Sequence, residues 1–336
     1  MWLRELWFVL VGILFTGYFI LEGFDYGVGM LHPFLNHTDL ERRASLNAIG
    51  PIWSANEVWL VAAGGALFAA FPYWYATMFS GFYLALILIL LALIVRGVGL
   101  EYRSQDKSPK WRATWDWLIF SGSLLTTILW GMAFANLVRG VPINGHMVYV
   151  GNFGTLFNGF SLWAALTFIL LFLTQGGAYL AIKGDSRSRK HGRMVAQKTV
   201  WPALIALVIW FVWMDRLPSS LGHVDTLAIV LQVVAVLALI LARFASYLTK
   251  NGWTLVLFSV SIASTTFSIF RILFPRVMVS SLNPAWSLTI YNASSTSYTL
   301  DIMSVTALII LPIILGYQSW LYWTFRKPVN DEELGY

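Results

Sequence analysis

The sequence predicts an all-α, polytopic transmembrane protein, and three observations support that class. Of the 336 residues, 58% are hydrophobic and only 11% are charged, whereas about a quarter of the residues in a soluble domain are charged. The apolar residues gather into roughly nine runs, and about 20 such residues are enough for a helix to cross a bilayer. The 17 Trp and 14 Tyr suit the aromatic belts at the two membrane–water interfaces.

Each expected span is an apolar run bounded by polar or basic residues. The N-terminal run has no small-residue cleavage site, so we interpret it as a retained first helix rather than a signal peptide. Glu57 and Pro72 lie near the two ends of the second run, and Asp215 and Arg216 end the sixth. The predicted spans cover roughly 7–31, 54–74, 78–100, 115–139, 155–182, 199–217, 224–247, 254–274 and 301–326.

The loops between these spans alternate between rich and poor in Lys and Arg. The loop after the fifth span is the richest, with Lys and Arg throughout 183–198, whereas the loop at 75–77 has none. Basic loops stay on the cytoplasmic side of a membrane. We therefore expect the N-terminus outside and the C-terminus inside.

The chain divides into two four-helix bundles plus one extra helix. The first unit covers 1–140, the second covers 150–275, and 276–336 holds an outer loop, the ninth span and a cytoplasmic tail. A faint similarity between 21–29 and 174–182, which end the first and fifth spans, is what an internal repeat of this kind produces. The glycines of the first of these stretches also permit close approach of another helix backbone.

Two carboxyl groups, Glu22 and Asp25, lie three residues apart in the inner half of the first span. Residues three apart are neighbours on a helix, and an acid within a span costs roughly 2.5–3.5 kcal/mol and usually faces the bundle interior or a watery cavity. Glu57 stands at the inner start of the second span, beside Ser54 and Asn56. We interpret these five residues as an inner half-channel that leads protons from the cytoplasm toward the midplane.

Three further charged residues lie at the same inner level. Arg96 and Glu101 flank the inner end of the third span, and Asp116 opens the fourth. For these residues we favour supporting ion pairs, Arg96 with Glu101 and Asp116 with a lysine of the neighbouring loop, that only fix the helices. A purely structural role is the alternative for the acids of the half-channel as well.

The composition argues against a cofactor or nucleic acid bound by this chain. Without cysteine there is no disulfide, thiolate metal site, iron–sulfur cluster or covalent haem motif. The basic residues fall in short loops rather than on one face, so they do not form a nucleic-acid footprint. All five histidines fall at span ends or in loops without a spacing that pairs them on one helix face: His32, His37, His146, His191 and His223.

Several stretches together carry a family resemblance. They read EGFDYGVGMLHPFL, WSANEVWLVAAGGALFAAFPYWYATMFSGFYLALILIL, RGVGLEYRS, WDWLIFSGS, NLVRGVP, SLNPAWSLTIYNASS and YQSWLYWTF. In their order and spacing they resemble subunit II of the cytochrome bd-type quinol oxidases. The resemblance extends over essentially the whole chain and is strongest in 20–105 and 280–325.

The resemblance implies a complex that reduces O2 to water with electrons from membrane quinol and with cytoplasmic protons. In that family two b-type haems and a d-type (or third b-type) haem belong to the larger subunit I, so this chain alone is expected to bind no cofactor and to be non-catalytic. The implied partners are subunit I in a heterodimer, membrane lipid and quinone, with a small single-span subunit left open. The implied location is the cell membrane of a bacterium or archaeon.

The resemblance also bears on individual residues. Asp25, within GFDYG, matches a family acid assigned to a proton path between the subunits. In some members an Asp directly follows the Trp of the second-span motif, whereas here Trp53 is followed by Ser54 and the acid is Glu57. A displacement of three residues is nearly one helical turn, so Glu57 could serve the same path from a neighbouring position. Glu101 stands where an Asp can occur.

Two other classes of function compete with this interpretation. Paired acids in a repeat-built membrane protein also suit a proton- or cation-coupled secondary transporter. That class predicts broken spans with polar residues near the midplane, whereas the later spans here are nearly free of charge. A pure scaffold predicts that replacing the acids changes assembly but leaves turnover unchanged.

Overall fold

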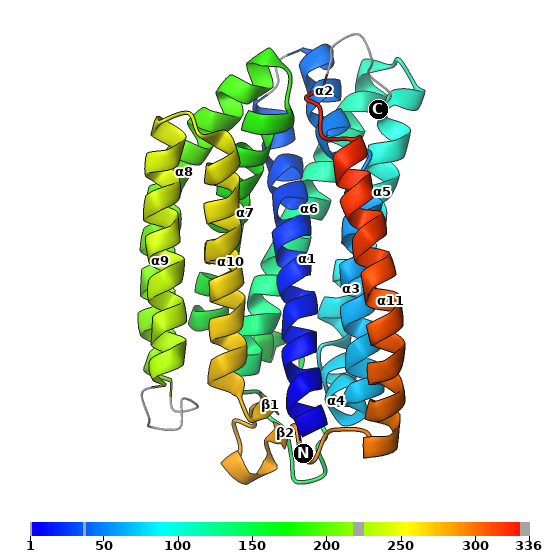
Figure 1. The fold of residues 1–336 in the computed structure, drawn as a ribbon, viewed down its shortest axis with the longest axis vertical. Coiled ribbons are helices and arrows are strands. Elements are labelled where there is room, and N and C mark those ends of the chain that lie inside the picture. Colours follow the sequence, from blue (N-terminus) through cyan, green and yellow to red (C-terminus); the bar gives the residue numbers. More distant parts are fainter. Residues whose placement is uncertain (1, 36–37, 218–224, 330–336) are drawn as a thin grey trace.

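The computed structural model describes residues 2–35, 38–217 and 225–329. Long helices run along one axis and form a single bundle (Figure 1). The helices are α1 (Trp2–Leu35), α2 (Asp39–Ile49), α3 (Trp53–Ala70), α4 (Pro72–Gly81), α5 (Tyr83–Tyr102), α6 (Pro109–Arg139), α7 (Gly159–Lys183), α8 (Ser186–Asp215), α9 (Thr226–Tyr247), α10 (Asn251–Leu273) and α11 (Ser297–Thr324). Two short antiparallel strands, β1 (Arg276–Met278) and β2 (Leu288–Thr289), lie in the segment between α10 and α11.

The predicted class, an all-α polytopic membrane protein, is confirmed. Within the described residues, eight helices are long and apolar enough to cross a membrane, and a ninth is added if α2 and α3, which meet at a bend of 43°, count as one broken span. The start of the seventh predicted span, at 224, lies outside the described residues.

The structure corrects two of the predicted spans. The second was expected to run to 74, but α3 ends at Ala70 and α4 begins at Pro72, because a proline has no N–H to continue the ladder and disfavours helical geometry in the residue before it. The sixth was expected from 199, but α8 begins at Ser186, where the Asp185 side chain accepts hydrogen bonds from the first free N–H groups. The basic segment predicted as a loop is therefore the inner extension of α8.

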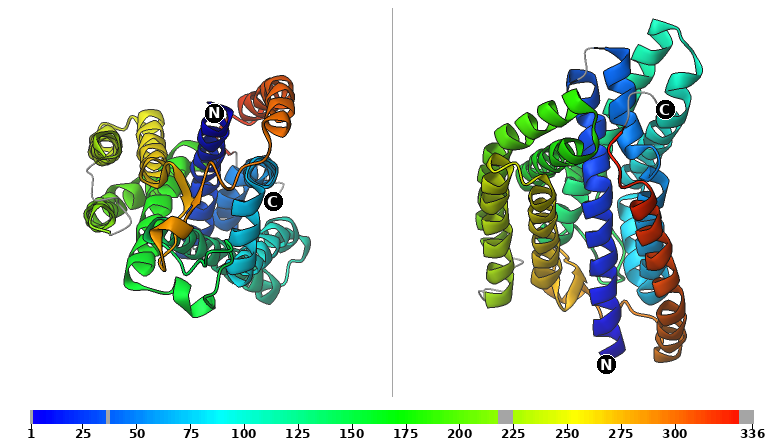
Figure 2. Two further views of the ribbon diagram at one scale, coloured as in Figure 1. Left: turned by 90° about the horizontal axis from the view of Figure 1, so that it is seen from below. Right: turned by 45° about the horizontal axis from the view of Figure 1, so that its top comes forward.

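Helix α1 is the centre of the bundle. It packs against α3 and α6 of the first predicted unit and against α7 and α10 of the second. Helix α11 contacts α3 and α1 and leaves most of its apolar surface exposed; seen from below it stands at the edge of the bundle (Figure 2). The ninth span is therefore the least buried of the long helices.

Glycines set the distance between α1 and α7. A Cβ atom at Gly176 would lie 2.5 Å from the backbone carbon of Gly27, and a Cβ at Gly27 would lie 2.8 Å from the Cα of Gly176. No side chain fits at that separation, so the two backbones touch where the sequence predicted a close approach. The crossing lies next to Asp25, half a turn along α1.

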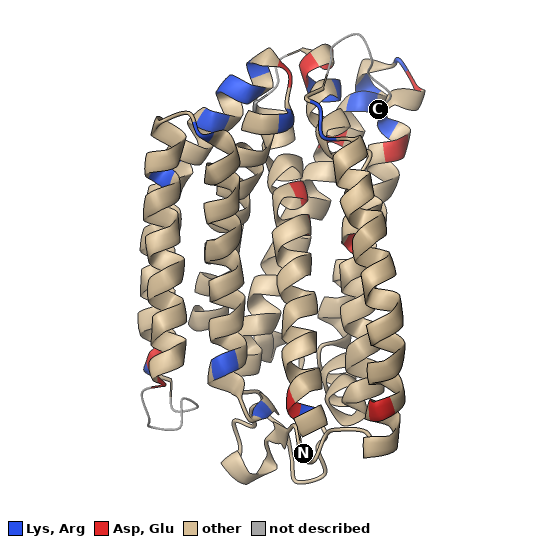
Figure 3. Cartoon of the chain, in the orientation of Figure 1, with Lys and Arg blue, Asp and Glu red and all other residues tan. Residues whose placement is uncertain are grey.

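The two ends of the bundle differ in charge. Lys and Arg gather at the end that holds the C-terminus, whereas the N-terminus lies at the opposite end (Figure 3). The basic end is the one that the positive-inside rule places in the cytoplasm. We refer to it below as the inner end.

Candidate functional site

A group of charged side chains is buried toward the inner end, where α1, α3 and α5 meet. Glu22 and Asp25 come from α1, Asn56 and Glu57 from the first turn of α3, and Arg96 from α5; we call these five residues the acid cluster. The side chains of Glu22 and Arg96 are fully buried, while that of Glu57 is 23% exposed. The cluster thus lies inside the protein with one member reaching its surface.

One guanidinium group lies between two carboxyl groups. Arg96 Nη1 is 3.2 Å from Glu22 Oε2 and 3.2 Å from Glu57 Oε1. The same guanidinium lies over the ring of Tyr26, with its carbon 4.9 Å from the ring centroid, a cation–π contact. Arg96 therefore joins α5 to both α1 and α3.

Asp25 is held by an amide rather than by a cation. Asn56 Nδ2 donates a hydrogen bond of 2.8 Å to Asp25 Oδ2. The hydroxyl of Tyr322, from the inner end of α11, donates a bond of 2.7 Å to Asn56 Oδ1. This chain of contacts connects the ninth span to the first.

Aromatic hydroxyl and indole groups continue the polar line toward the middle of α1. The hydroxyl groups of Tyr18 and Tyr26 are hydrogen-bonded to each other, and Trp130 Nε1 donates to Tyr18 Oη at 3.1 Å. Positions 18, 22 and 26 are each one turn apart and share a face of α1. That spacing is the signal in the sequence that could have found these two tyrosines.

Several polar atoms of the acid cluster make no hydrogen bond to the described protein atoms. They are both carboxyl oxygens of Glu22, Asp25 Oδ1, and Nε and Nη2 of Arg96. The 3.2 Å contact of Glu22 Oε2 with Arg96 is an ion pair without hydrogen-bond geometry. An unmade hydrogen bond at a buried polar group costs about 1–3 kcal/mol. Buried protein groups of this kind are those that bind ordered water.

Not all of the predicted site residues meet. The structure brings together Glu22, Asp25, Asn56 and Glu57, but the side chain of Ser54 is exposed and lies outside the acid cluster. We therefore leave Ser54 out of the site.

The expected ion pair of Arg96 with Glu101 is wrong. Arg96 contacts Glu22 and Glu57 instead, whereas Glu101 is exposed. Five residues of helix separate the two side chains by about 140° around the axis, so they leave α5 on different sides. Glu101 and Glu57 both line a groove of about 500 Å3 between α3 and α5, whose other walls are mainly apolar.

The expected pairing of Asp116 with a loop lysine is also wrong. Asp116 lies two turns inside α6 and contacts His32 Nε2 at 2.6 Å and Arg42 Nη1 at 2.7 Å. Arg103 also bonds to it, and Arg103 Nη2 lies 3.0 Å from Asp39. We call these five residues the Asp116 cluster. The short turn after α5 brings Arg103 alongside α6, which sequence spacing alone did not indicate.

The described histidines are not placed as haem or metal ligands. His32 is fully buried, but its two ring nitrogens contact Asp116 and Ser45, so neither is available as an axial ligand. His146 is exposed and His191 partly exposed, and no group of three metal-binding side chains occurs in the described parts of the chain. His37 and His223 lie outside those parts.

Comparison with known proteins then decides the family. A sequence model described as cytochrome bd terminal oxidase subunit II matches residues 3–325. The chain belongs to this family. Among its relatives, "Cytochrome bd ubiquinol oxidase subunit 2" of Bacillus subtilis is 41% identical over 331 residues, which cover 98% of each chain. "Cytochrome bd-I ubiquinol oxidase subunit 2" of Escherichia coli K12 is 36% identical over 372 aligned positions, covering 99% of this chain and 96% of the relative.

A solved structure shares the fold. It is titled "The structure of bd oxidase from Geobacillus thermodenitrificans", and it matches with a TM-score of 0.79 over 97% of this chain and 99% of that one. The two chains are only 16% identical, so this likeness concerns the fold alone. The resemblance to the bd oxidase subunit II family and the multi-pass membrane location are both confirmed.

Proposed function

We propose that this chain is the haem-free subunit II of a bd-type quinol:O2 oxidoreductase and that its acid cluster is a proton inlet open to the cytoplasm. The printed names of its relatives describe subunits of ubiquinol oxidases. Every electron used to convert O2 to water is matched by one proton, so such a complex needs a route for protons to the place where oxygen is reduced. The haems of the complex would lie in the partner, subunit I.

The observation that carries the proposal is the charge balance of the acid cluster. It combines three carboxyl groups, those of Glu22, Asp25 and Glu57, with the single cation Arg96. Buried charges are stable only when they are paired, so the excess of carboxyl groups favours the uptake of protons. The polar atoms left without a protein partner suit the binding of water, which conducts protons between such groups.

The partly exposed Glu57 indicates where the inlet meets the partner. It opens onto the groove between α3 and α5, and α11 beside it presents a long exposed apolar face. We propose that subunit I covers this side in a heterodimer. Membrane lipid and quinone remain expected neighbours, and a small single-span subunit remains an expectation from the resemblance.

The decisive experiment replaces Asp25 by Asn in the intact complex. Asparagine keeps the shape and cannot take up a proton, so quinol-driven O2 consumption should fall by roughly tenfold or more, a typical loss when a positioned proton carrier is removed. The haem spectrum and the amount of assembled complex should stay at the wild-type level. The matched control is Asp301→Asn, an exposed carboxylate at the outer end of α11.

The same experiment separates the alternatives. Wild-type turnover in the Asp25→Asn complex would contradict the inlet. Loss of assembled complex with unchanged turnover per haem would support the scaffold. The family match already speaks against a secondary transporter.

A further inference from the structure

A polar pocket lies at the inner end of the bundle, apart from the groove beside Glu57. Its volume is about 300 Å3, and it is bounded by the connection from α2 to α3, the end of α7 and the end of α11. Asn47, Tyr179, Lys183 and Tyr322 contribute polar groups to its walls. Since one water molecule takes up ~30 Å3 in the liquid, the pocket has room for several.

The segment that follows α11 forms part of the wall of this pocket. We call Phe325–Val329 the C-terminal strap. Lys183 holds the strap through three hydrogen bonds. Its ammonium group donates to the backbone oxygens of Phe325 and of Lys327, the latter at 3.1 Å. Its own backbone oxygen accepts from Val329 N at 2.9 Å. The end of α7 thus holds the strap in place beside the pocket.

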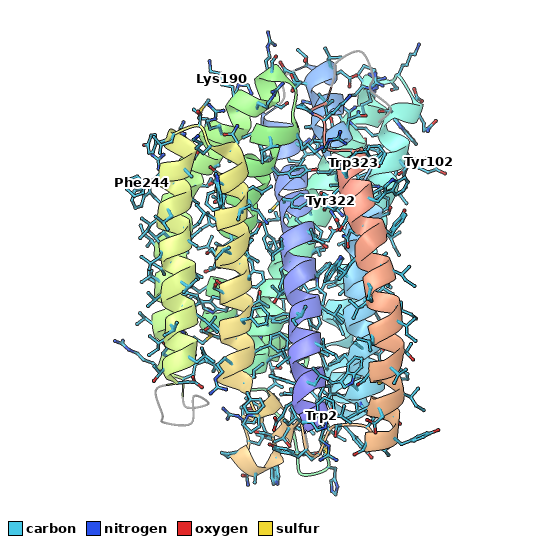
Figure 4. All side chains as sticks on the ribbon, viewed as in Figure 1. Trp2, Tyr102, Lys190, Phe244, Tyr322 and Trp323 are labelled. Carbon is cyan, nitrogen blue, oxygen red and sulfur yellow. The ribbon has the colours of Figure 1, made fainter. Side chains whose placement is uncertain are left out.

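One residue of the pocket wall also bonds to the acid cluster. Tyr322 lines the pocket and also donates its hydroxyl to Asn56, which in turn donates to Asp25. Beside it, Tyr179 stacks on Phe24 with ring centroids 4.1 Å apart, and Phe24 is the residue next to Asp25. Figure 4 places Tyr322 near the inner end of α11, close to the strap.

We propose that this pocket is the cytoplasmic vestibule of the inlet and that Tyr322 is the positioning residue in its wall. This proposal rests on the proposed function. It adds the pocket as the entrance, the C-terminal strap as part of its wall, and Tyr322 as the residue between the pocket and the acid cluster. The pocket opens at the basic, inner end of the bundle and reaches Asp25 through two side chains.

Tyr322 acts through Asn56. An amide donates through its NH2 group and accepts through its oxygen. The two groups are similar in size, but only the NH2 group can donate to a carboxylate. By donating to Asn56 Oδ1, Tyr322 fixes the amide so that its N–H group faces Asp25. An amide N–H does not pass its proton on at neutral pH, so Asn56 only orients Asp25. The proton passes beside Asn56, on water that joins the vestibule to Asp25 Oδ1, the carboxyl oxygen without a protein partner.

The absence of cysteine from the chain permits a direct test of the vestibule. Thr324 lines the pocket, and Thr114 is an exposed threonine at the same inner end, away from it. Both hydroxyl groups bond to the carbonyl four residues earlier, which makes Thr114→Cys a matched control for Thr324→Cys. Each complex is treated in inside-out vesicles with a charged, membrane-impermeant maleimide, and O2 consumption is measured with pre-reduced quinol.

We expect both cysteines to be labelled and only the labelled Thr324→Cys complex to lose O2 consumption, by several-fold. The treated wild-type complex corrects for thiols of the partner. Labelled Thr324→Cys with an unchanged rate would overturn the vestibule. If Asp25→Asn is inactive at the same time, the inlet stands and its entrance lies elsewhere; if Asp25→Asn is fully active, the proposed function itself fails.

Tyr322→Phe tests the positioning residue. It keeps the ring and removes the hydroxyl that orients Asn56. We expect the midpoint of the pH–rate profile to shift by ~0.5 unit or more, a change in the environment of a titrating group, while haem content stays constant. Tyr317→Phe, at an exposed tyrosine of the same helix, should leave the profile in place. A Tyr322→Phe complex with the wild-type profile would overturn this role.

Discussion

The acid cluster and the Asp116 cluster are both buried charge groups at the inner end, yet they are built in opposite ways. The acid cluster has three carboxyl groups and one guanidinium. The Asp116 cluster has two carboxyl groups, of Asp116 and Asp39, and two arginines, Arg42 and Arg103; Asp39 also contacts Arg112, just outside the cluster. In the acid cluster, carboxyl groups outnumber arginines; around Asp116 and Asp39, arginines outnumber carboxyl groups once Arg112 is counted.

The difference teaches what a buried carboxylate can do. A carboxylate held by two arginines and a histidine, as Asp116 is, is locked in its charged form and ties helices together. A carboxyl group that shares one arginine with others can take up a proton when its charge is not matched. Burial alone therefore does not indicate a proton carrier, and we expect the ratio of acids to cations to distinguish one.

The largest effect should come from Asp116→Asn. It leaves Arg42, Arg103 and their neighbours without their shared carboxylate, and arginine cannot lose its proton to relieve the repulsion. Removing one partner of a buried ion pair costs about 3–5 kcal/mol, so we expect little assembled complex in the membrane and a lower Tm for what remains. Asp106→Asn, in the exposed loop before α6, is the control. Wild-type stability of Asp116→Asn would remove the contrast between the clusters.

A smaller loss of stability is expected for Arg96→Gln. The carboxyl groups that lose their cation can become neutral by binding protons, so the cost should be nearer 1–3 kcal/mol, that of unmade buried hydrogen bonds. Thermal unfolding of the purified complex measures it, and Arg139→Gln, at an exposed end of α6, serves as control. A destabilisation as large as that of Asp116→Asn would show that the acid cluster is locked too.

The smallest effect should come from Glu57→Gln. Glu57 is the partly exposed acid, and water can replace part of its role, so we expect stability to change by less than ~1 kcal/mol and O2 consumption to fall by about threefold, which is ~0.7 kcal/mol of barrier. Glu101→Gln, in the same groove, should leave both quantities unchanged. Equal effects of the two substitutions would mean that contact with Arg96 is not what matters.

Features that depend on residues close together in the sequence could be predicted from it. The apolar runs and the alternation of basic loops indicated the class and the orientation, and the spacing of Glu22 and Asp25 placed both acids on one helix face. These features depend on the bilayer and on helical geometry, which act within one segment.

Contacts between distant segments could not be predicted in the same way. Tyr322 lies 266 positions from Asn56, and only the docking of α11 brings them together. The expected partners of Arg96 and Asp116 were wrong for the same reason: both lie within a few residues in the sequence, whereas the observed partners come from other helices. His32 lies at the end of a span, as expected, but its burial between α2 and α6 depends on the fold.

The contact between Gly27 and Gly176 sets how closely α1 packs against α7. The two backbones touch without room for a side chain between them, and Asp25 stands half a turn from the point of contact. The position of the two acids of α1 therefore depends on how α1 packs against α7. A Cβ atom added at position 27 or 176 would force α1 and α7 apart at this point. It would thereby move Glu22 and Asp25 away from their contacts with Arg96 and Asn56.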